Sequence, residues 1–308
     1  MRIYNDIRII AVDHGYGNIK TANCCFPTGV IESDTEPTFT HDLLVWSGKY
    51  YSIGAGHKEF IADKFEDDDY YVLTLAAIAR ELRQEKITEA KVYIAAGLPL
   101  TWVANQKDRF KEYLVRNKKE KFVFRGIEYS VEIVDAGLFP QGFAAAAEHI
   151  SEFKGANMLC DIGNGTMNLL RIVNKKPDIQ NMFTEKYGTH QCALAIRENM
   201  LKVHHTVVDE AIITEILRTG TADIDKEYLE TIIATAKEYT AGIFRRLRER
   251  EYDPKLMKLY VVGGGGCLIK NFADIERVAI NDDICVNAKG FEFMAYQKMI
   301  RGRYDVLK

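Results

Sequence analysis

The chain has 308 residues, enough for one large domain or for two lobes with separate cores. Its formal net charge of −3 gives no sign of a surface that coats nucleic acid, so direct DNA binding is not expected. No run approaches the roughly 20 apolar residues that span a bilayer, and the first residues do not lead into a secretion signal. The six cysteines form neither a C-x-x-C pair nor a zinc-finger spacing. We therefore predict a cytoplasmic protein with reduced thiols and no membrane contact.

Apolar runs that alternate with helical spacing predict an α/β fold. The expected strands and hairpins are 7–13, 43–46 with 50–53, 92–96, 122–124 with 129–134, 158–160 with 169–173, and 259–262. The expected helices are 70–83, 141–150, 189–200, 206–218, 226–250 and 290–300.

Two glycine-rich turns, each opened by an aspartate behind an apolar strand, are the most informative feature. The first is Asp13-His14-Gly15-Tyr16-Gly17-Asn18-Ile19-Lys20 and the second is Asp161-Ile162-Gly163-Asn164-Gly165-Thr166. Either one alone could be an ordinary hairpin turn, in which Asp and Gly are frequent. The pair suggests a duplicated fold whose two halves serve one ligand.

The chemistry of these turns suits a phosphate chain with a metal ion. Glycines let several backbone N–H groups point inward as a nest for phosphate oxygens. A carboxylate beside such a nest makes sense when a hard cation lies between them, and Mg²⁺ commonly takes one or two carboxylates together with phosphates. Asp13 and Asp161 are therefore the expected metal ligands, and Lys20 could reach phosphate as a point charge.

A third glycine cluster follows the strand at 259–262. Gly263, Gly264, Gly265 and Gly266 allow close approach of the backbone to a flat ligand or to ribose and phosphate, although a merely permissive loop is the simpler alternative. No G-K-[ST] follows, so this is not a Walker A loop.

In combination and order, these segments resemble the actin, heat-shock-chaperone and sugar-kinase ATPase superfamily. Three of them are similar to plasmid-segregation actins of the ParM/StbA type: the first turn at 13–20, Ala96-Gly97-Leu98-Pro99-Leu100, and Val286-Asn287-Ala288-Lys289-Gly290-Phe291. The resemblance implies a bilobed actin-like (ribonuclease H-like) fold of two duplicated α/β lobes. The expected lobes are 1–152 with 290–308 and 153–289, and the boundary is expected within residues 152–157.

The resemblance also implies the function. It is that of an ATPase that binds ATP or GTP with Mg²⁺ and that polymerises into filaments. In relatives, such filaments segregate plasmid DNA through a DNA-binding adaptor protein. The alternative on the same fold is a small-molecule kinase or phosphohydrolase.

Site residues follow from the same resemblance. The phosphate-lining residues of the first lobe are Gly15, Tyr16, Gly17, Asn18 and Lys20, those of the second are Gly163, Asn164, Gly165 and Thr166, and Gly263 to Gly266 meet the adenosine. Asp13, Asp161 and Gln141 form the catalytic set, in which Gln141 aligns the attacking water by hydrogen bonds.

Two of these assignments leave alternatives open. Glu148, two helical turns beyond Gln141, could orient the water instead. Lys237 and Glu238 are candidates for holding the base, but an exposed charged helix face explains them better.

Overall fold

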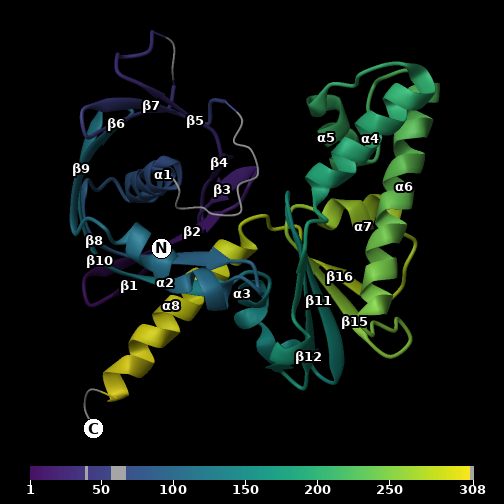
Figure 1. The fold of residues 1–308 in the computed structure, drawn as a ribbon. Coiled ribbons are helices and arrows are strands. Elements are labelled where there is room, and N and C mark those ends of the chain that lie inside the picture. Colours follow the sequence, from purple (N-terminus) through teal and green to yellow (C-terminus); the bar gives the residue numbers. More distant parts are fainter. Residues whose placement is uncertain (39–40, 57–66, 306–308) are drawn as a thin grey trace. The chain divides into compact units, whose positions relative to one another are not determined.

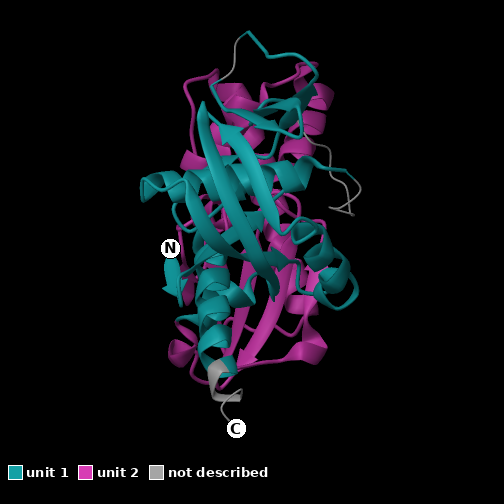
Figure 2. Ribbon diagram, turned by 90° about the vertical axis from the view of Figure 1, so that its left-hand side faces the viewer, with its two compact units in different colours: residues 1–148, 285–308 teal, residues 149–284 magenta. Residues whose placement is uncertain are grey.

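The computed structural model describes residues 1–38, 41–56 and 67–305 and divides into two compact units. Unit 1 comprises Met1–Glu148 with Cys285–Lys308, and unit 2 comprises His149–Ile284 (Figure 2). Each unit combines a sheet with helices, so the predicted α/β class is confirmed. Within the described ranges, no helix has the length and apolar character required to cross a membrane.

Unit 1 is built on a ten-stranded mixed sheet in which β2, β8 and β10 run parallel. The strands, in sheet order, are β4 (Cys25–Pro27), β3 (Asn18–Lys20), β2 (Ile7–His14), β8 (Glu89–Leu98), β10 (Ile127–Pro140), β9 (Lys119–Phe124), β6 (Leu43–Trp46), β7 (Lys49–Ile53) and β5 (Val30–Ser33), with β1 (Arg2–Tyr4) beside β2. The helices are α1 (Asp69–Gln84), α2 (Val103–Leu114), α3 (Phe143–Ala147) and α8 (Val286–Asp305).

Alternation along β2 places a core on each face of this sheet. Ile10 and Val12 belong to the core that contains α1, whereas Ile9 and Ala11 belong to the core that contains α8. Successive side chains of a strand point to opposite faces, so a run that is apolar throughout indicates a strand buried on both. The sheet also curls around α1 (Figure 1), of which 12 of 16 residues are buried.

Two glycines allow α8 to pack closely within unit 1. A Cβ atom added at Gly97 would lie 2.0 Å from Cζ of Phe291, and one added at Gly290 would lie 2.0 Å from the carbonyl oxygen of Ala144. The Gly-Leu-Pro segment and the C-terminal Asn-Ala-Lys-Gly-Phe segment therefore contact each other directly.

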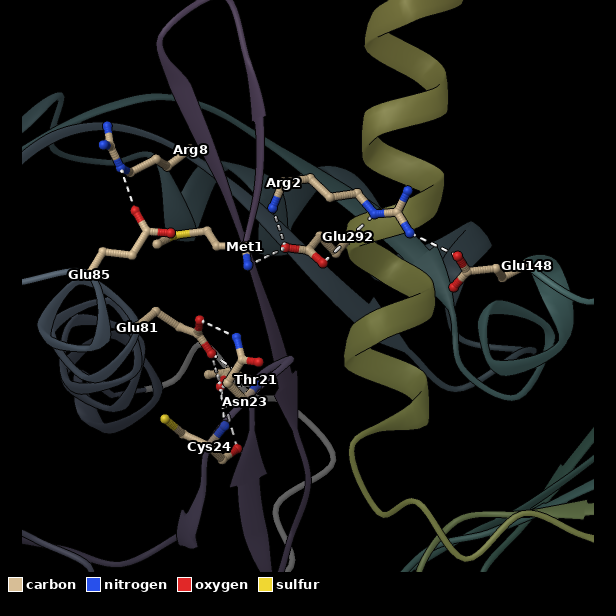
Figure 3. A network of polar contacts seen from close by, with 10 residues as sticks. All are labelled: Met1, Arg2, Arg8, Thr21, Asn23, Cys24, Glu81, Glu85, Glu148 and Glu292. Carbon is tan, nitrogen blue, oxygen red and sulfur yellow. Dashed lines mark hydrogen bonds and ion pairs between the residues drawn. The ribbon is translucent and has the colours of Figure 1, made fainter.

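Polar contacts join β1 to α8 and to the end of the α3 segment (Figure 3). The Glu292 carboxylate accepts a hydrogen bond from the backbone N–H of Arg2 at 2.6 Å and lies 3.7 Å from the Met1 amino group. The Arg2 guanidinium also donates to Glu148 at 2.8 Å. These contacts hold the first residues of the chain against its last helix.

Unit 2 is built on a six-stranded sheet with one main core. Its strands are β13 (Lys176–Pro177), β12 (Met167–Val173), β11 (Ala156–Ile162), β15 (Lys258–Val262) and β16 (Val278–Ile280) in sheet order, with β14 (Phe183–Glu185) beside β12. The helices are α4 (Thr189–His204), α5 (Glu210–Thr219), α6 (Lys226–Glu249) and α7 (Gly266–Phe272), with short 3₁₀ turns η1 (Ile150–Glu152) and η2 (Ile179–Asn181).

The helix predicted over 141–150 is the clearest difference from expectation. It spans only Phe143–Ala147, because Gly142 has a φ of 76° and the backbone N–H of Gln141 donates to the carbonyl of Leu98 at 2.9 Å. Gln141 thus extends the end of the sheet and precedes the helix. At the other end of the chain, α8 begins at Val286, four residues earlier than the sequence predicts.

Candidate functional site

In unit 1, the carboxyl ends of the parallel strands bring together residues that are far apart in the sequence. Asp13 lies at the end of β2, and Gln141 follows β10. The side-chain amide of Gln141 donates to Oδ1 of Asp13 at 2.7 Å, and both side chains are buried. Ligands of α/β proteins commonly bind at the carboxyl ends of parallel strands.

The first glycine turn places a cation beside the same carboxylate. Lys20 pairs with Asp13 across β2 and β3, and its Nζ lies 3.6 Å from Oδ2 of Asp13. Gly15 is required in the turn, since a Cβ atom there would lie 2.6 Å from the carbonyl oxygen of Asn18. The hydroxyl of Thr28 donates to the Gly15 carbonyl at 2.7 Å and fixes the turn from the other side.

A buried carboxylate on α1 anchors the segment that follows Lys20 (Figure 3). Glu81 accepts hydrogen bonds from the Thr21 hydroxyl and from both the backbone N–H, at 3.1 Å, and the side-chain amide, at 2.9 Å, of Asn23. The backbone N–H of Cys24 in turn donates to the Thr21 hydroxyl at 2.8 Å. Motif analysis missed Glu81, because nothing near it in the sequence marks it as part of the site.

His14, within the first turn, takes a structural position. His14 is fully buried, with Nε2 2.8 Å from the Thr74 hydroxyl and its ring edge-on to Phe110. Burial raises the pKa of the Tyr16 phenol above its ordinary value.

The second turn in unit 2 repeats the arrangement of the first. Asp161 on β11 faces Asn168 on β12, seven residues later, just as Asp13 faces Lys20. The Asn168 amide donates to Oδ2 of Asp161 at 3.5 Å, and the backbone N–H of Gly163 donates to the Thr166 carbonyl at 2.8 Å. The two turns differ in charge, because the residue paired with the aspartate is a lysine in unit 1 and an asparagine in unit 2.

The third glycine cluster packs against Asp161. Gly263 has a φ of 85°, and a Cβ atom there would lie 2.5 Å from Oδ1 of Asp161. One added at Gly265 would lie 2.2 Å from Cγ2 of Ile162, whose carbonyl accepts from the Gly265 N–H at 2.8 Å. Gly264 is exposed with no atom near its Cβ position, and Gly266 begins α7.

The first residues of α4 form backbone hydrogen bonds to the second turn. The backbone N–H groups of Thr189 and His190 donate to the carbonyls of Gly163 and Asn164 at 3.1 and 2.9 Å. Gly188 packs so tightly that a Cβ atom would lie 2.2 Å from the Asn164 oxygen. Its carbonyl accepts from the Tyr239 hydroxyl on α6 at 2.9 Å, a contact that sequence reasoning missed.

The remaining candidates lie outside these clusters. Lys237 and Glu238 are exposed on α6, although their neighbour Tyr239 points inward to Gly188. Glu148, the alternative to Gln141, forms a surface ion pair with Arg2.

Each unit thus offers one buried carboxylate beside a glycine turn, Asp13 in unit 1 and Asp161 in unit 2. Among the residues that the structure describes, no group of three or more His, Cys, Asp or Glu side chains could hold a metal ion. A donor set of one carboxylate per turn fits Mg²⁺, which takes its other ligands from phosphates and water.

The comparisons with known proteins show an actin-like fold. Residues 11–143 match the family described as actin like proteins N terminal domain. The whole chain resembles the actin-like protein Alp7A (16 % identity, 96 % of this chain and 98 % of that chain covered, TM-score 0.74) and the archaeal actin homolog Ta0583 in complex with ADP (18 %, 94 % and 99 %, 0.73).

Two further similar structures are a ParM protein and a filament of an actin-like protein. They are apo psk41 ParM (15 % identity, 98 % and 100 % covered, TM-score 0.69) and the Alp12 filament (16 %, 96 % and 100 %, 0.68). No curated protein sequence matches the chain. The predicted resemblance to ParM-type actins is thus confirmed at the level of the fold.

Proposed function

We propose that the chain is an actin-like ATPase whose filaments assemble with bound nucleotide and segregate plasmid DNA through a DNA-binding adaptor. The observation that supports this most is the contact of Gln141 with Asp13, beside Lys20. It joins a carboxylate, a cation and a neutral amide at strand ends 128 residues apart in the chain. These are the groups needed to bind a metal–phosphate complex and to orient water.

The similar structures support the nucleotide and the assembly separately. One structure of Ta0583 is a complex with ADP, and the Alp12 structure is that of a filament. We infer that this chain binds ATP or GTP with Mg²⁺ and self-associates in the cytoplasm, without membrane contact.

Under this proposal, units 1 and 2 correspond to the two actin-like lobes, and each aspartate turn binds nucleotide phosphate. Asp13 and Asp161 are the carboxylates for Mg²⁺, which would neutralise charge that develops on the phosphates. The first turn (Gly15 to Lys20) and the second turn (Gly163 to Thr166) line the phosphates, and Gly263 to Gly266 approach the adenosine.

Gln141 aligns the attacking water under this proposal. An amide cannot act as a strong base, so its contribution is orientation by hydrogen bonding. Lys237 and Glu238 would hold the base from their exposed positions on α6.

Light scattering recorded together with phosphate release tests the main proposal. ATP with Mg²⁺ should raise both signals, and an absence of nucleotide-dependent scattering at every protein concentration would contradict filament formation. Phosphate release without scattering would instead favour a phosphohydrolase on this fold.

Three variants test the site. Asp161→Ala should abolish hydrolysis, whereas Asp274→Ala, at an exposed position of the same unit, should leave it unchanged. Gln141→Ala should slow hydrolysis while nucleotide binding and assembly persist. Loss of binding in Gln141→Ala, or full activity in Asp161→Ala, would refute these roles.

The adaptor can be tested by gel shift. With a net charge of −3, the protein alone should not retard centromere-like DNA, and filaments should attach to DNA only when the adaptor is added. Tight, salt-sensitive binding of DNA by the protein alone would remove the need for an adaptor.

A further inference from the structure

The backbone makes an unusual turn directly after Gln141. Gly142 has φ and ψ angles of 76° and −64°, and the backbone N–H of Phe143 donates to the Gln141 carbonyl at 2.9 Å. A hydrogen bond between residues i and i+2 with these angles defines a γ-turn of the positive-φ form, which is rare and strained. Strain of this kind persists only where the surrounding structure fixes the backbone, and it is concentrated at functional sites.

Hydrogen bonds from two other elements hold this γ-turn. The backbone N–H of Gln141 donates to the Leu98 carbonyl at the end of β8 at 2.9 Å. The backbone N–H of Gly142 donates to Oδ1 of Asn287, in the first turn of α8, at 2.8 Å. Gly142 is buried and Asn287 is 6 % exposed. Loss of the Asn287 oxygen would therefore leave a buried backbone donor without its acceptor.

One face of α8 fixes Asn287 at the turn. Gly290 and Phe291 follow Asn287 by three and four residues, so the three share a face of the helix. Gly290 packs against the carbonyl of Ala144, and Phe291 packs against Gly97. Helix α8 therefore lies against the start of α3 (Figure 1) and against the end of β8, the two segments that adjoin Gln141.

We propose that Asn287 is a positioning residue for the water-aligning Gln141. The Asn287 oxygen holds the γ-turn, and the turn fixes Gln141 at the strand end, where its amide donates to Oδ1 of Asp13 at 2.7 Å. A reacting group displaced by about 1 Å can cost about a hundredfold in rate. Asn287 acts through Gln141 and touches neither nucleotide nor water. This inference rests on the proposed ATPase function and deepens it.

Substitution of Asn287 provides the first test. Asn287→Leu removes the acceptor at a similar side-chain volume. It should lower kcat for ATP hydrolysis about tenfold or more and leave KM within about twofold, because Gln141 acts on the attacking water and not on nucleotide binding. A parent that hydrolyses ATP while Asn287→Leu keeps the parental kcat would overturn the positioning role and leave the ATPase function standing.

A conservative variant tests whether the accepted hydrogen bond is the cause. Asn287→Asp keeps an acceptor oxygen, and a negative charge is favourable in the first turn of a helix. Its kcat should therefore lie within about threefold of the parental value. An Asn287→Asp variant as slow as Asn287→Leu would overturn the role of this hydrogen bond.

Asn157→Leu is the matched control for loss of a buried asparagine. Asn157 on β11 is 3 % exposed, and its amide donates to the carbonyls of Lys154 and Gly155 at 3.0 and 3.3 Å. This variant should lower the melting temperature but leave kcat unchanged well below it. A loss of kcat equal to that of Asn287→Leu would assign both effects to general destabilisation and overturn the positioning role.

A double variant tests the route of action. Because Asn287 acts through Gln141, the two substitutions should not add. In the Gln141→Ala background, Asn287→Leu should change kcat by less than about twofold. A further loss of about tenfold would overturn the route through Gln141.

Hydrogen–deuterium exchange tests the turn without reference to activity. Amide exchange in the segment 140–144 should be faster in Asn287→Leu than in the parent, whereas Asn287→Asp and Asn157→Leu should exchange like the parent. Unchanged exchange in Asn287→Leu would overturn Asn287 as the support of the turn. If the exchange result holds but the parent hydrolyses no nucleotide, the proposed function falls and takes the positioning role with it, while the structural contact stands.

Discussion

Replacement of Gly97 by alanine would place a methyl group where the ring of Phe291 lies. The added Cβ would be 2.0 Å from Cζ of Phe291, and non-bonded carbons need about 3.5–4.0 Å. The ring would have to move by roughly 1.5–2 Å. It has no free space for this, because Phe291 is fully buried and its ring is stacked with that of Phe139. Overpacking of this kind typically costs about 1–3 kcal/mol, and we expect Gly97→Ala to lie at the upper end.

Thermal and urea unfolding measure this effect. A loss of about 3 kcal/mol would lower the melting temperature of unit 1 by roughly 6–12 °C. Gly302→Ala on α8 is the matched control, since nothing lies within 4 Å of its Cβ position, and it should be neutral or slightly stabilising.

A double-mutant cycle decides whether the Phe291 ring is the cause. Leucine at position 291 lacks the three ring atoms, Cζ, Cε1 and Cε2, that the new methyl group would meet. Gly97→Ala combined with Phe291→Leu should therefore be less destabilised than the sum of the single variants, by about 1–3 kcal/mol. Strict additivity, or a Gly97→Ala variant within about 0.5 kcal/mol of the parent, would refute the packing argument.

Two further changes in unit 1 have predictable effects. Glu81→Ala should destabilise the protein by about 2–4 kcal/mol, because the Thr21 hydroxyl and neighbouring donors lose their buried acceptor. Urea unfolding measures this loss of stability, and a loss under about 1 kcal/mol would contradict the anchoring role of Glu81. Burial favours a higher pKa for Asp42, but the hydrogen bond from Arg125 and the charge of Arg80 outweigh it and lower the pKa. The resulting stabilisation is present at neutral pH and is lost as the pH falls through the lowered pKa. Asp42→Asn should therefore cost about 1 kcal/mol at pH 7, and the gap to the parent should close below about pH 4; a gap independent of pH would contradict this.

Features that depend on local pattern could be predicted from the sequence. The apolar run before Asp13 indicates β2. Asp13 and Lys20 are seven residues apart, a spacing typical of a short hairpin, and the structure pairs them across β2 and β3. The helix at 141–150 was overestimated, because alanine-rich composition favours helix while Gly142 and the strand-end contact of Gln141 limit it.

Features that depend on tertiary contacts could not be predicted. In the sequence, Glu81 cannot be told from other charged residues on a helix. Its contact with Thr21 exists because α1 is buried inside the curled sheet. Tyr239 likewise has no motif, and its contact with Gly188 exists because α6 packs beside the start of α4.

The chain order of unit 1 has a consequence for synthesis on the ribosome. Ile9 and Ala11 pack in a core that also contains Phe291 and Ala295, and these come from the last 24 residues of the chain. Unit 2 is contiguous and can fold as soon as it emerges, whereas one face of β2 stays uncovered until α8 is released. We therefore expect nascent chains that stop before residue 285 to engage chaperones, and unit 1 to complete its fold only after α8 has left the ribosome.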